Sequence, residues 1–274
     1  MRVTEINIYP VKSLGGVTVD TAAVEPWGLA GDRRWAVTAE DGQVHTARDL
    51  HAMLGMTATP AAAGAITLAA PGLAPIEVSP PVGGPRRPAR FDRLDVAVGA
   101  DEAADRWMSR ALGTPARLVW LEDPRRRPVG PSHGGRPGDT MVLQDDGPLL
   151  LTSLASLRSL DDWIAQDAVE RGEEPPAALP MHRFRPNVVV DGGEPFAEDS
   201  WTRVRIGEVG YRFAEHCDRC VLTTIDTRTL TPGSEPVRTL SRHRKWDGRV
   251  FFGVRLIPEG PGEVRLGDQV TPLP

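Results

Sequence analysis

Apolar and polar positions alternate with a period of two over roughly the first hundred residues, the pattern of half-buried β-strands. The segment Val3–Val11 opens the chain in this way. Asp41-Gly42 lies between two such runs and indicates a hairpin, because its turn needs positive φ. Pro80–Arg90 is rich in proline and is expected to be a loop. The other strands expected in this half are Arg34–Thr38, Gln43–Ala47, Ala65–Ala69, Ile76–Ser79, Leu94–Val98 and Arg117–Leu121.

A period of 3.6 replaces this alternation in a few segments, which are expected to be helices. The first is Asp101–Leu112. The second follows a strand at Pro148–Leu151, and Thr152 or Ser153 stands where its N-cap belongs. A third, shorter helix is expected at Glu235–Arg244.

The second half otherwise returns to strands. Val221–Ile225 is apolar and β-branched, which is typical of a strand. Glu122–Asp139 is irregular and is either a linker or a binding loop. Short strands with Gly and Pro turns predict a mainly β fold, a barrel or sandwich, with peripheral helices. The further strands expected are Val188–Val190, Thr202–Ile206, Val209–Phe213, Val250–Ile257 and Glu263–Val270.

Composition narrows the function classes. The 274 residues hold 32 Lys and Arg against 37 Asp and Glu, a net charge of −5, which excludes a general attraction to nucleic acid or an anionic membrane. The N-terminus lacks the apolar region of a signal peptide, and no run approaches the ~18 apolar residues that span a bilayer. A cytoplasmic protein is expected, and its 2 cysteines exclude a disulfide framework.

The two cysteines stand three positions apart, in His216-Cys217-Asp218-Arg219-Cys220. A C-x-x-C pair can be a redox dithiol, but that needs a βαβ context that is missing here. It can be half of a zinc site, although few further ligands lie nearby. Both thiols can simply be buried, or one can be a thiolate ligand of a soft metal, which Arg219 would favour. The spacing leaves these alternatives open.

Several basic and polar residues can bind anions, although each is also compatible with a plain solvated side chain. Lys12 and Ser13, at a strand end, can hold a phosphate through a point charge and a hydroxyl. Arg33 and Arg48 flank the expected hairpin, and their guanidinium groups can fork onto phosphate or carboxylate. Asn187, behind Arg185 in the chain, offers a donor and an acceptor to a polar heterocycle.

Taken in order, a set of short motifs resembles the MOSC family of molybdenum-cofactor-binding proteins. The motifs are YPVKS (9–13), DR (32–33), TAR (46–48), FRPN (184–187), EDSW (198–201), RCVLTTID (219–226) and LGDQV (266–270). The N-terminal part is similar to the β-barrel domain that precedes MOSC in the amidoxime-reducing branch. The resemblance implies a barrel-like domain over residues 1–115 and a MOSC β-barrel domain over 116–274.

The resemblance also implies a site. Cys220 matches the family's catalytic, molybdenum-ligating thiolate, whereas Cys217 does not and is expected to be buried or to lie behind the ligands. Asp218 stands where a small neutral residue is expected, and its carboxylate would repel a phosphate unless Arg219 or another base offsets it. The implied cofactor-binding residues are Lys12, Ser13, Arg33, Arg48, Thr152, Ser153, Arg185, Asn187 and Arg219.

The implied activity is the two-electron reduction of N-oxygenated compounds on a molybdenum–molybdopterin (pyranopterin) cofactor, without pyridoxal phosphate. Two cysteines are too few for a Cys₄ iron–sulfur cluster, so an external donor is expected: a ferredoxin, a cytochrome b5-like protein or a flavin reductase. The alternative is a non-catalytic carrier of the cofactor. No nucleic-acid or membrane partner is expected, and a basic pocket should stand out in an otherwise acidic protein.

Overall fold

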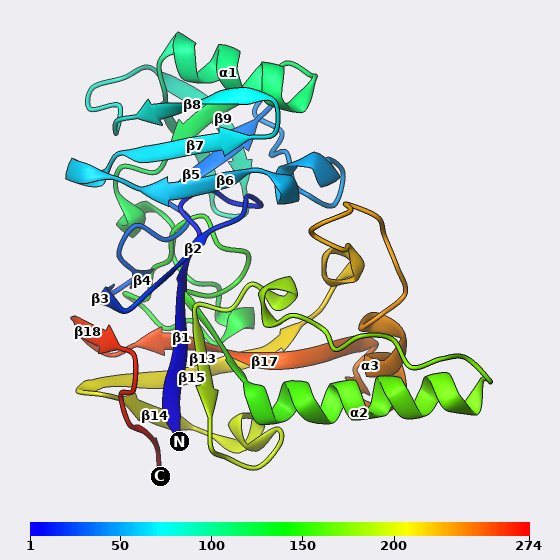
Figure 1. Cartoon of the computed structure of the whole chain (residues 1–274). Coiled ribbons are helices and arrows are strands. Elements are labelled where there is room, and N and C mark those ends of the chain that lie inside the picture. Colours follow the sequence, from blue (N-terminus) through cyan, green and yellow to red (C-terminus); the bar gives the residue numbers. More distant parts are fainter. The chain divides into compact units, whose positions relative to one another are not determined.

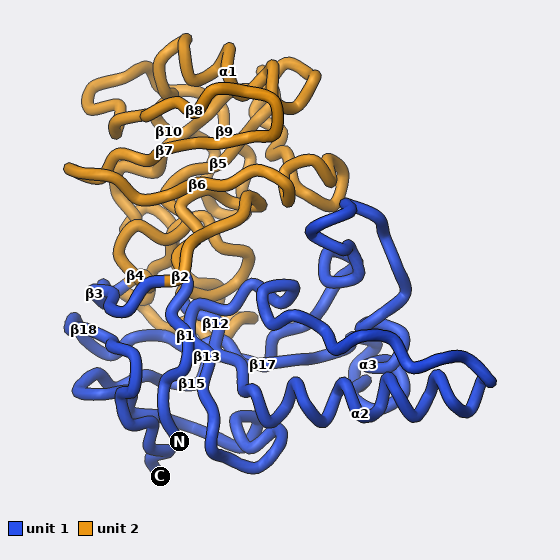
Figure 2. The backbone as a smooth tube through the Cα atoms, viewed as in Figure 1, with its two compact units in different colours: residues 1–7, 19–26, 149–274 blue, residues 8–18, 27–148 orange.

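Nineteen short strands and three α-helices make up the computed structural model, which describes residues 1–274 (Figure 1). The expectation of a mainly β fold with peripheral helices is confirmed. The chain divides into two compact units, coloured separately in Figure 2. Unit 1 contains residues 1–7, 19–26 and 149–274, and unit 2 contains residues 8–18 and 27–148. The chain therefore passes from one unit to the other at four points.

Unit 1 is built on one large sheet. Its strands follow the order β19-β14-β15-β17-β12-β13-β1, and the short β16 pairs with the start of β17. Only β12 and β13 are parallel neighbours, and the helix between them makes the crossover that a parallel pair needs. The bounds are β1 Arg2–Ile8, β12 Leu149–Ser153, β13 Val188–Asp191, β14 Arg203–Ile206, β15 Val209–Asp218, β16 Lys245–Trp246, β17 Arg249–Pro258 and β19 Val270–Leu273. Separately, β3 (Thr21–Glu25) pairs with β18 (Gly262–Arg265).

Helices α2 (Leu154–Glu170) and α3 (Val237–His243) belong to the same unit. The Ser153 hydroxyl caps α2 by accepting from the amide of Ala155 at 3.2 Å, as its predicted N-cap position requires. Asp167 of α2 ties the two helices together by accepting from Arg242 of α3 at 2.5 Å. No helix of the structure is both long and apolar enough to cross a membrane. The core under these helices contains Leu157, Leu160, Ile164, Met181, Phe184, Val189, Leu240, Val250 and Phe252.

Unit 2 holds a four-stranded sheet, β5-β11-β10-β9, and a three-stranded sheet, β6-β7-β8. Helix α1 (Glu102–Leu112) begins where the Asp101 carboxylate accepts from the Ala104 amide at 2.8 Å, and it ends at Gly113 in the left-handed region. The strand bounds are β4 Gly28–Leu29, β5 Trp35–Thr38, β6 Thr57–Pro60, β7 Ile66–Ala70, β8 Leu73–Val78, β9 Arg86–Phe91, β10 Leu94–Gly99 and β11 Arg117–Trp120, and β2 (Val17–Val19) spans one crossing between the units.

In unit 2 the predicted loop is partly wrong, and the second strand of the predicted hairpin is shorter than expected. Arg86–Phe91, the end of the expected Pro80–Arg90 loop, is strand β9, and its Pro88 is tolerated because β9 is an edge strand. The Asp41-Gly42 hairpin forms, with positive φ at Gly42 and an antiparallel bridge from Thr38 to Val44 on the edge of β5 that β11 leaves open, but Gln43–Ala47 is too short a pairing to be a regular strand.

Two strands predicted in unit 1 are also wrong. Val221–Thr224 is a short 3₁₀ helix, in which the Thr223 hydroxyl donates to the Cys220 carbonyl at 3.0 Å in place of a strand ladder. The expected strand Glu263–Val270 is split into β18 and β19 by a turn with positive φ at Gly267.

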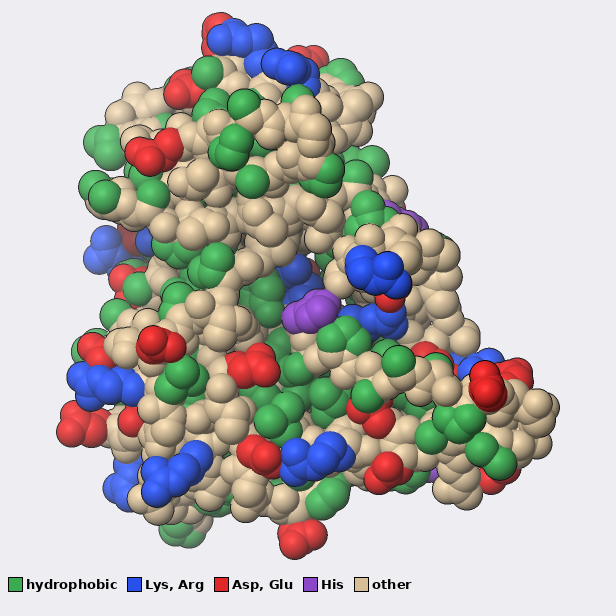
Figure 3. All heavy atoms as spheres, viewed as in Figure 1, with side chains coloured by type: hydrophobic (Ala, Val, Ile, Leu, Met, Phe, Trp, Pro, Cys, Tyr) green, Lys and Arg blue, Asp and Glu red, His purple; other side chains and the backbone are tan.

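Charged side chains of both signs are interspersed over the face of the molecule shown in Figure 3. This mixture agrees with the small net charge of −5. Any strongly basic site is therefore local.

Candidate functional site

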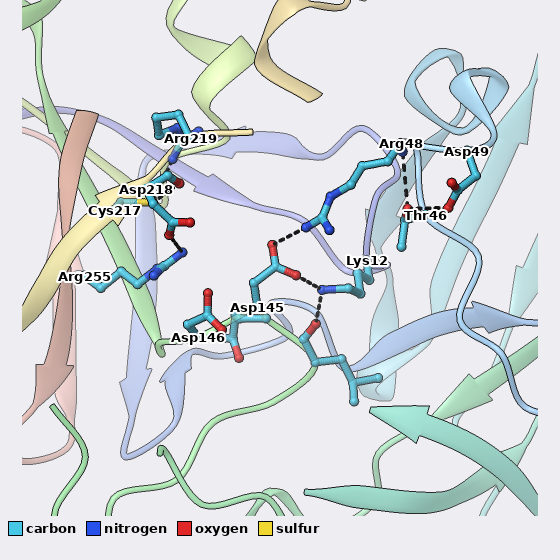
Figure 4. A network of polar contacts seen from close by, with 12 residues as sticks. Lys12, Thr46, Arg48, Asp49, Asp145, Asp146, Cys217, Asp218, Arg219 and Arg255 are labelled. Atoms are coloured by element: carbon cyan, nitrogen blue, oxygen red, sulfur yellow. Dashed lines mark hydrogen bonds and ion pairs between the residues drawn. The ribbon is translucent and has the colours of Figure 1, made fainter. Parts of the chain in front are cut away.

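In unit 2, one carboxylate connects two of the cations that the sequence singled out (Figure 4). The Lys12 side chain is only 12% exposed, and its Nζ donates to the Leu143 carbonyl at 3.1 Å and to Asp145 Oδ1 at 2.5 Å. Arg48 Nη2 lies 3.8 Å from the other carboxylate oxygen of Asp145. The structure thus brings Lys12 and Arg48 to a single anionic group of the chain itself.

The surroundings of Lys12 have opposing effects on its pKa. Burial lowers the pKa of Lys12 below its ordinary value, while the Asp145 carboxylate opposes this effect by stabilising the ammonium. The like charges of Arg127 and Arg33 lower the pKa further. A cation held in this way gains from any additional negative charge placed beside it.

Arg33 and Ser13 are fixed by the backbone and by an internal partner. Both residues have positive φ, at 43° and 70°, and both are largely buried. Arg33 Nη1 donates to Asp32 at 2.7 Å and its guanidinium lies 4.5 Å from the ring centroid of Tyr9. Asp32 is fully buried and accepts from the Tyr9 amide, so the Asp-Arg pair orients the arginine.

Arg127 is a residue that the sequence analysis missed. It follows two other arginines in the irregular segment 122–139, yet it is only 2% exposed. Its guanidinium donates to the carbonyls of Val142, Gln144 and Asp145, and its Nε to that of Asp92. Burial lowers the pKa of Arg127 to about 10. Arg127 thus anchors the loop of residues 142–145, which contacts Lys12. At this point the segment 122–139 is not a free linker.

In unit 1, the two cysteines have opposite environments. Cys217 lies in β15 and is 4% exposed, whereas Cys220 is exposed just beyond the end of that strand. Both are free thiols. The Cys220 carbonyl accepts from the amide and hydroxyl of Thr223, which holds the backbone behind the exposed thiol. Only Cys220 can offer its sulfur to a ligand without unfolding the strand.

Arg219 stands between the two thiols in sequence and lacks an anionic partner. Its Nη1 donates to Cys217 Sγ at 2.8 Å and its Nη2 to the Phe184 carbonyl at 2.6 Å (Figure 4 labels the residue). Its Nε is buried and has no hydrogen-bond partner, and no carboxylate lies within ion-pair distance. A buried donor without a hydrogen bond is costly unless an acceptor is supplied.

The unexpected carboxylate at Asp218 is neutralised inside unit 1. Arg255, 8% exposed, donates to Asp218 at 3.1 Å and to Glu215 at 2.6 Å. Figure 4 shows Arg255 pointing at the Asp218 carboxylate. The base that offsets Asp218 is therefore Arg255, and Arg219 is left to other partners.

The remaining predicted contacts also serve the fold. Thr152 is fully buried and its hydroxyl lies 3.2 Å from the Met181 sulfur, while Ser153 caps α2. The Asn187 side chain accepts from the Leu150 amide and donates to the Asn7 carbonyl, both at 3.2 Å. Arg185 has a positive φ of 55° just after the 3₁₀ turn Met181–Phe184. For these four residues, cofactor binding stays a prediction.

Residues of two sequence motifs, EDSW and LGDQV, make contacts that stabilise the fold of unit 1. In EDSW, Glu198 is buried and accepts from the Ser156 hydroxyl at 2.7 Å, and burial raises its pKa. Asp199 of the same motif forms an ion pair with Arg244. In LGDQV, Asp268 accepts from the Arg265 amide at 2.8 Å and closes the turn between β18 and β19.

Comparison with known proteins assigns the whole chain. The family model described as "MOSC domain" matches residues 133–271, and the one described as "MOSC N-terminal beta barrel domain" matches residues 1–115. The chain belongs to the MOSC family. The barrel-type N-terminal domain expected from the sequence is confirmed by this match, whereas the boundary near residue 115 stays a prediction, since the compact units interleave along the chain.

Curated MOSC relatives cover the chain almost completely. Mitochondrial amidoxime-reducing component 1 of Homo sapiens is 33% identical over 98% of this chain and 82% of its own length. Mitochondrial amidoxime reducing component 2 of Rattus norvegicus is 32% identical with the same coverage. The molybdenum cofactor sulfurase of Solanum lycopersicum is 24% identical over 98% of this chain but only 35% of its own length.

The residues of this MOSC chain fit a phosphate-bearing pterin with a soft metal. In unit 1 the buried Nε of Arg219 has no acceptor, and in unit 2 Lys12 and Arg48 lie beside one carboxylate, as they would beside an oxyanion of a ligand. Cys220 supplies an exposed sulfur, the donor type that molybdenum prefers. Unit 2 thus offers cations for a phosphate, and unit 1 offers an open donor and a soft ligand for a metal.

Proposed function

We propose that this MOSC protein is a molybdenum-cofactor-dependent reductase of N-hydroxylated compounds. The observation that carries the proposal is the pairing of an exposed Cys220 thiol with Arg219, whose buried Nε lacks an acceptor. The similarity to amidoxime-reducing components over most of their length supports the reaction type.

The reaction balances with two electrons and two protons. An amidoxime, R–C(NH₂)=N–OH, takes up both, its N–O bond breaks, and the products are the amidine R–C(NH₂)=NH and water. When bound, the cofactor supplies the two-electron redox chemistry, as cofactors do in such enzymes. The electrons come from an external carrier: a ferredoxin, a cytochrome b5-like protein or a flavin reductase.

The chain's own residues bind and orient. Cys220 ligates the metal through its thiolate, and Arg219 donates from its open Nε to an acceptor of the cofactor. Lys12, Arg33 and Arg48 neutralise the phosphate, which carries close to two negative charges. Ser13, Thr152, Ser153, Arg185 and Asn187 are the further proposed cofactor contacts.

The test uses full-length protein from a host that makes the cofactor. Molybdenum and pterin contents are measured beside the rate of benzamidoxime reduction with a reduced ferredoxin or cytochrome b5. Cys220→Ala is expected to lose molybdenum and activity, because no other exposed thiol exists in the chain. Cys217→Ser is the matched control and is expected to keep both. A Cys220→Ala protein that retains molybdenum and reduces benzamidoxime would refute the ligand assignment.

A cofactor carrier is the second candidate, because the chain also matches part of a protein named molybdenum cofactor sulfurase. The same experiment separates the two functions. Molybdenum cofactor bound by Cys220 without turnover, in the presence of a competent donor, would favour the carrier over the reductase.

A further inference from the structure

Asp145 is an exposed carboxylate placed among cations of unit 2. Its side chain is 55% exposed, yet its two oxygens face Lys12 Nζ at 2.5 Å and Arg48 Nη2 at 3.8 Å (Figure 4). It also stabilises the charges of Arg33 and Arg127. One negative charge thus serves four positive ones, and it occupies the position from which an oxyanion would contact both Lys12 and Arg48.

The backbone under Asp145 is held by contacts from Arg127 and Arg33. The buried guanidinium of Arg127 donates to the carbonyls of Val142, Gln144 and Asp145. Leu143 is held as well, because its amide donates to the Arg33 carbonyl at 3.0 Å. The loop therefore keeps its shape when the Asp145 side chain rotates away, and Lys12 keeps its contact with the Leu143 carbonyl.

The carboxylate is easier to displace than the cation it covers. Lys12 is nearly buried and cannot be rehydrated without moving the loop, whereas Asp145 already faces water. Ion pairs with an exposed partner contribute little, because water solvates that partner well when the pair opens. An incoming oxyanion therefore exchanges with Asp145 at a modest cost and leaves Lys12 paired.

We propose that Asp145 is an internal anion that occupies the oxyanion position on Lys12 and Arg48 and is displaced when a phosphate group binds. Asp145 thereby lowers the affinity of this position for every anion, because each anion must compete with it. A ligand that is held by further contacts displaces Asp145, whereas a common, weakly bound anion does not. The inference rests on the proposed function, in which this cluster holds the cofactor's phosphate.

The test compares two phosphate esters as probes on the full-length chain. Methyl phosphate is a dianion at pH 8 and dimethyl phosphate is a monoanion, and calorimetry gives the affinity of each. If Asp145 leaves the site on binding, its cost is the same for both probes. Asp145→Asn should therefore raise both affinities by the same factor, about fivefold for an exposed ion pair. Asp146→Asn, the neighbouring carboxylate, is the matched control and should change neither.

A second readout follows Lys12 itself. The only lysines of the chain are Lys12 and the exposed Lys245, so acetylation by N-hydroxysuccinimidyl acetate can be read at each by mass spectrometry. Asp145 raises the pKa of Lys12, so Asp145→Asn increases its neutral fraction and its labelling relative to Lys245. Methyl phosphate should protect Lys12 and leave Lys245 unchanged.

The outcomes separate the inference from the proposed function. A gain that is much larger for the dianion would mean that Asp145 stays in place and repels the ligand, and an unchanged pair of affinities would mean that it does not compete. Either result overturns the inference, provided that Lys12→Met abolishes binding. If instead wild type binds neither ester, or Lys12→Met binds both like wild type, the phosphate role of this cluster is refuted.

Discussion

Lys12 in unit 2 and Arg219 in unit 1 are held by different kinds of partner. In unit 2, Lys12 is paired with an exposed carboxylate, Asp145. In unit 1, Arg219 is paired with a thiol and a carbonyl, and one of its donors has no acceptor at all. An anion that binds Lys12 must replace a charge, whereas an anion that binds Arg219 adds a charge where none was present.

This difference predicts how each unit contributes to affinity. At Lys12 the net gain in binding free energy is the difference between the energies of two ion pairs, and this difference is small. At Arg219 the gain includes a new charge-assisted hydrogen bond to a buried donor, which is worth more. The thiol of Cys217 is suited to this role, because it accepts a hydrogen bond without neutralising the guanidinium. The following variants test the supports of each cation, starting with the largest effect.

Arg127→Met should give the largest change, in the stability of unit 2. The substitution leaves the carbonyls of Val142 and Gln144 without their donor, and each unsatisfied buried acceptor costs about 1–3 kcal/mol. We expect the free energy of unfolding to fall by about 3 kcal/mol, measured by urea denaturation. Hydrogen exchange should show the loss of protection at residues 142–145.

Arg125→Met is the control for this experiment, since that side chain is 77% exposed in the same segment. It should change the free energy of unfolding by no more than about 0.5 kcal/mol. Equal effects of the two variants would show that Arg127 is not the anchor of the loop.

Cys217→Ala should have an intermediate effect, on cofactor retention through unit 1. It removes the acceptor of Arg219 Nη1, so the guanidinium is free to turn away from its position. We expect about tenfold weaker binding of the cofactor, equivalent to one lost hydrogen bond to a charged group. Cys217→Ser keeps an acceptor and should remain within about twofold of wild type. Equal losses in both variants would point to packing of the sulfur rather than to its hydrogen bond.

Asp226→Asn should have the smallest effect, a loss of stability that is fully present only above about pH 4. Amide hydrogen bonds from Thr229 and Arg228, helped by Arg183, lower the pKa of Asp226 to about 2. A depressed carboxylate pKa contributes stability above the unfolded value near 4, and this stability is lost as pH falls through 2. The difference in unfolding free energy between wild type and variant should therefore shrink from pH 4 to pH 2. A difference that stays constant over this range would exclude ionisation as its cause.

Asp226 also sharpens the contrast with Asp145. Both are carboxylates on loops beside a basic side chain, but backbone amides hold Asp226 whereas Asp145 faces the cations Lys12 and Arg48. Asp226 is thus a structural part of its loop, whereas the proposal for Asp145 requires that it exchange its partners.

The elements that the sequence predicted well have local signals. Helix α1 has an Asp N-cap and a Gly end, and α2 has a Ser cap, so each boundary is encoded within a few residues. The errors came where distant partners decide. Arg86–Phe91 becomes a strand only because β10 pairs with it, and Gln43–Ala47 pairs with β5 through a single bridge at Val44 rather than through a full ladder.

The same distinction holds for the site. Cys220 and Lys12 were found because they stand in recognisable motifs. Arg127 was missed because an arginine among three successive arginines gives no sign of burial. Asp145 was missed because its importance depends on Lys12, more than a hundred positions away, which no local pattern reveals.

The interleaved path of the chain has a consequence for its synthesis on the ribosome. Strand β1 ends at Ile8, whereas β13, its neighbour on one edge, begins only at Val188. At about 5–20 residues per second, the ribosome takes roughly 10–40 s to supply that partner. Unit 2 is complete once residue 148 has been made, so it can fold before β13 is available to pair with β1. One edge of β1 therefore stays unpaired long after the strand has been made, and the nascent chain must keep that edge from pairing elsewhere.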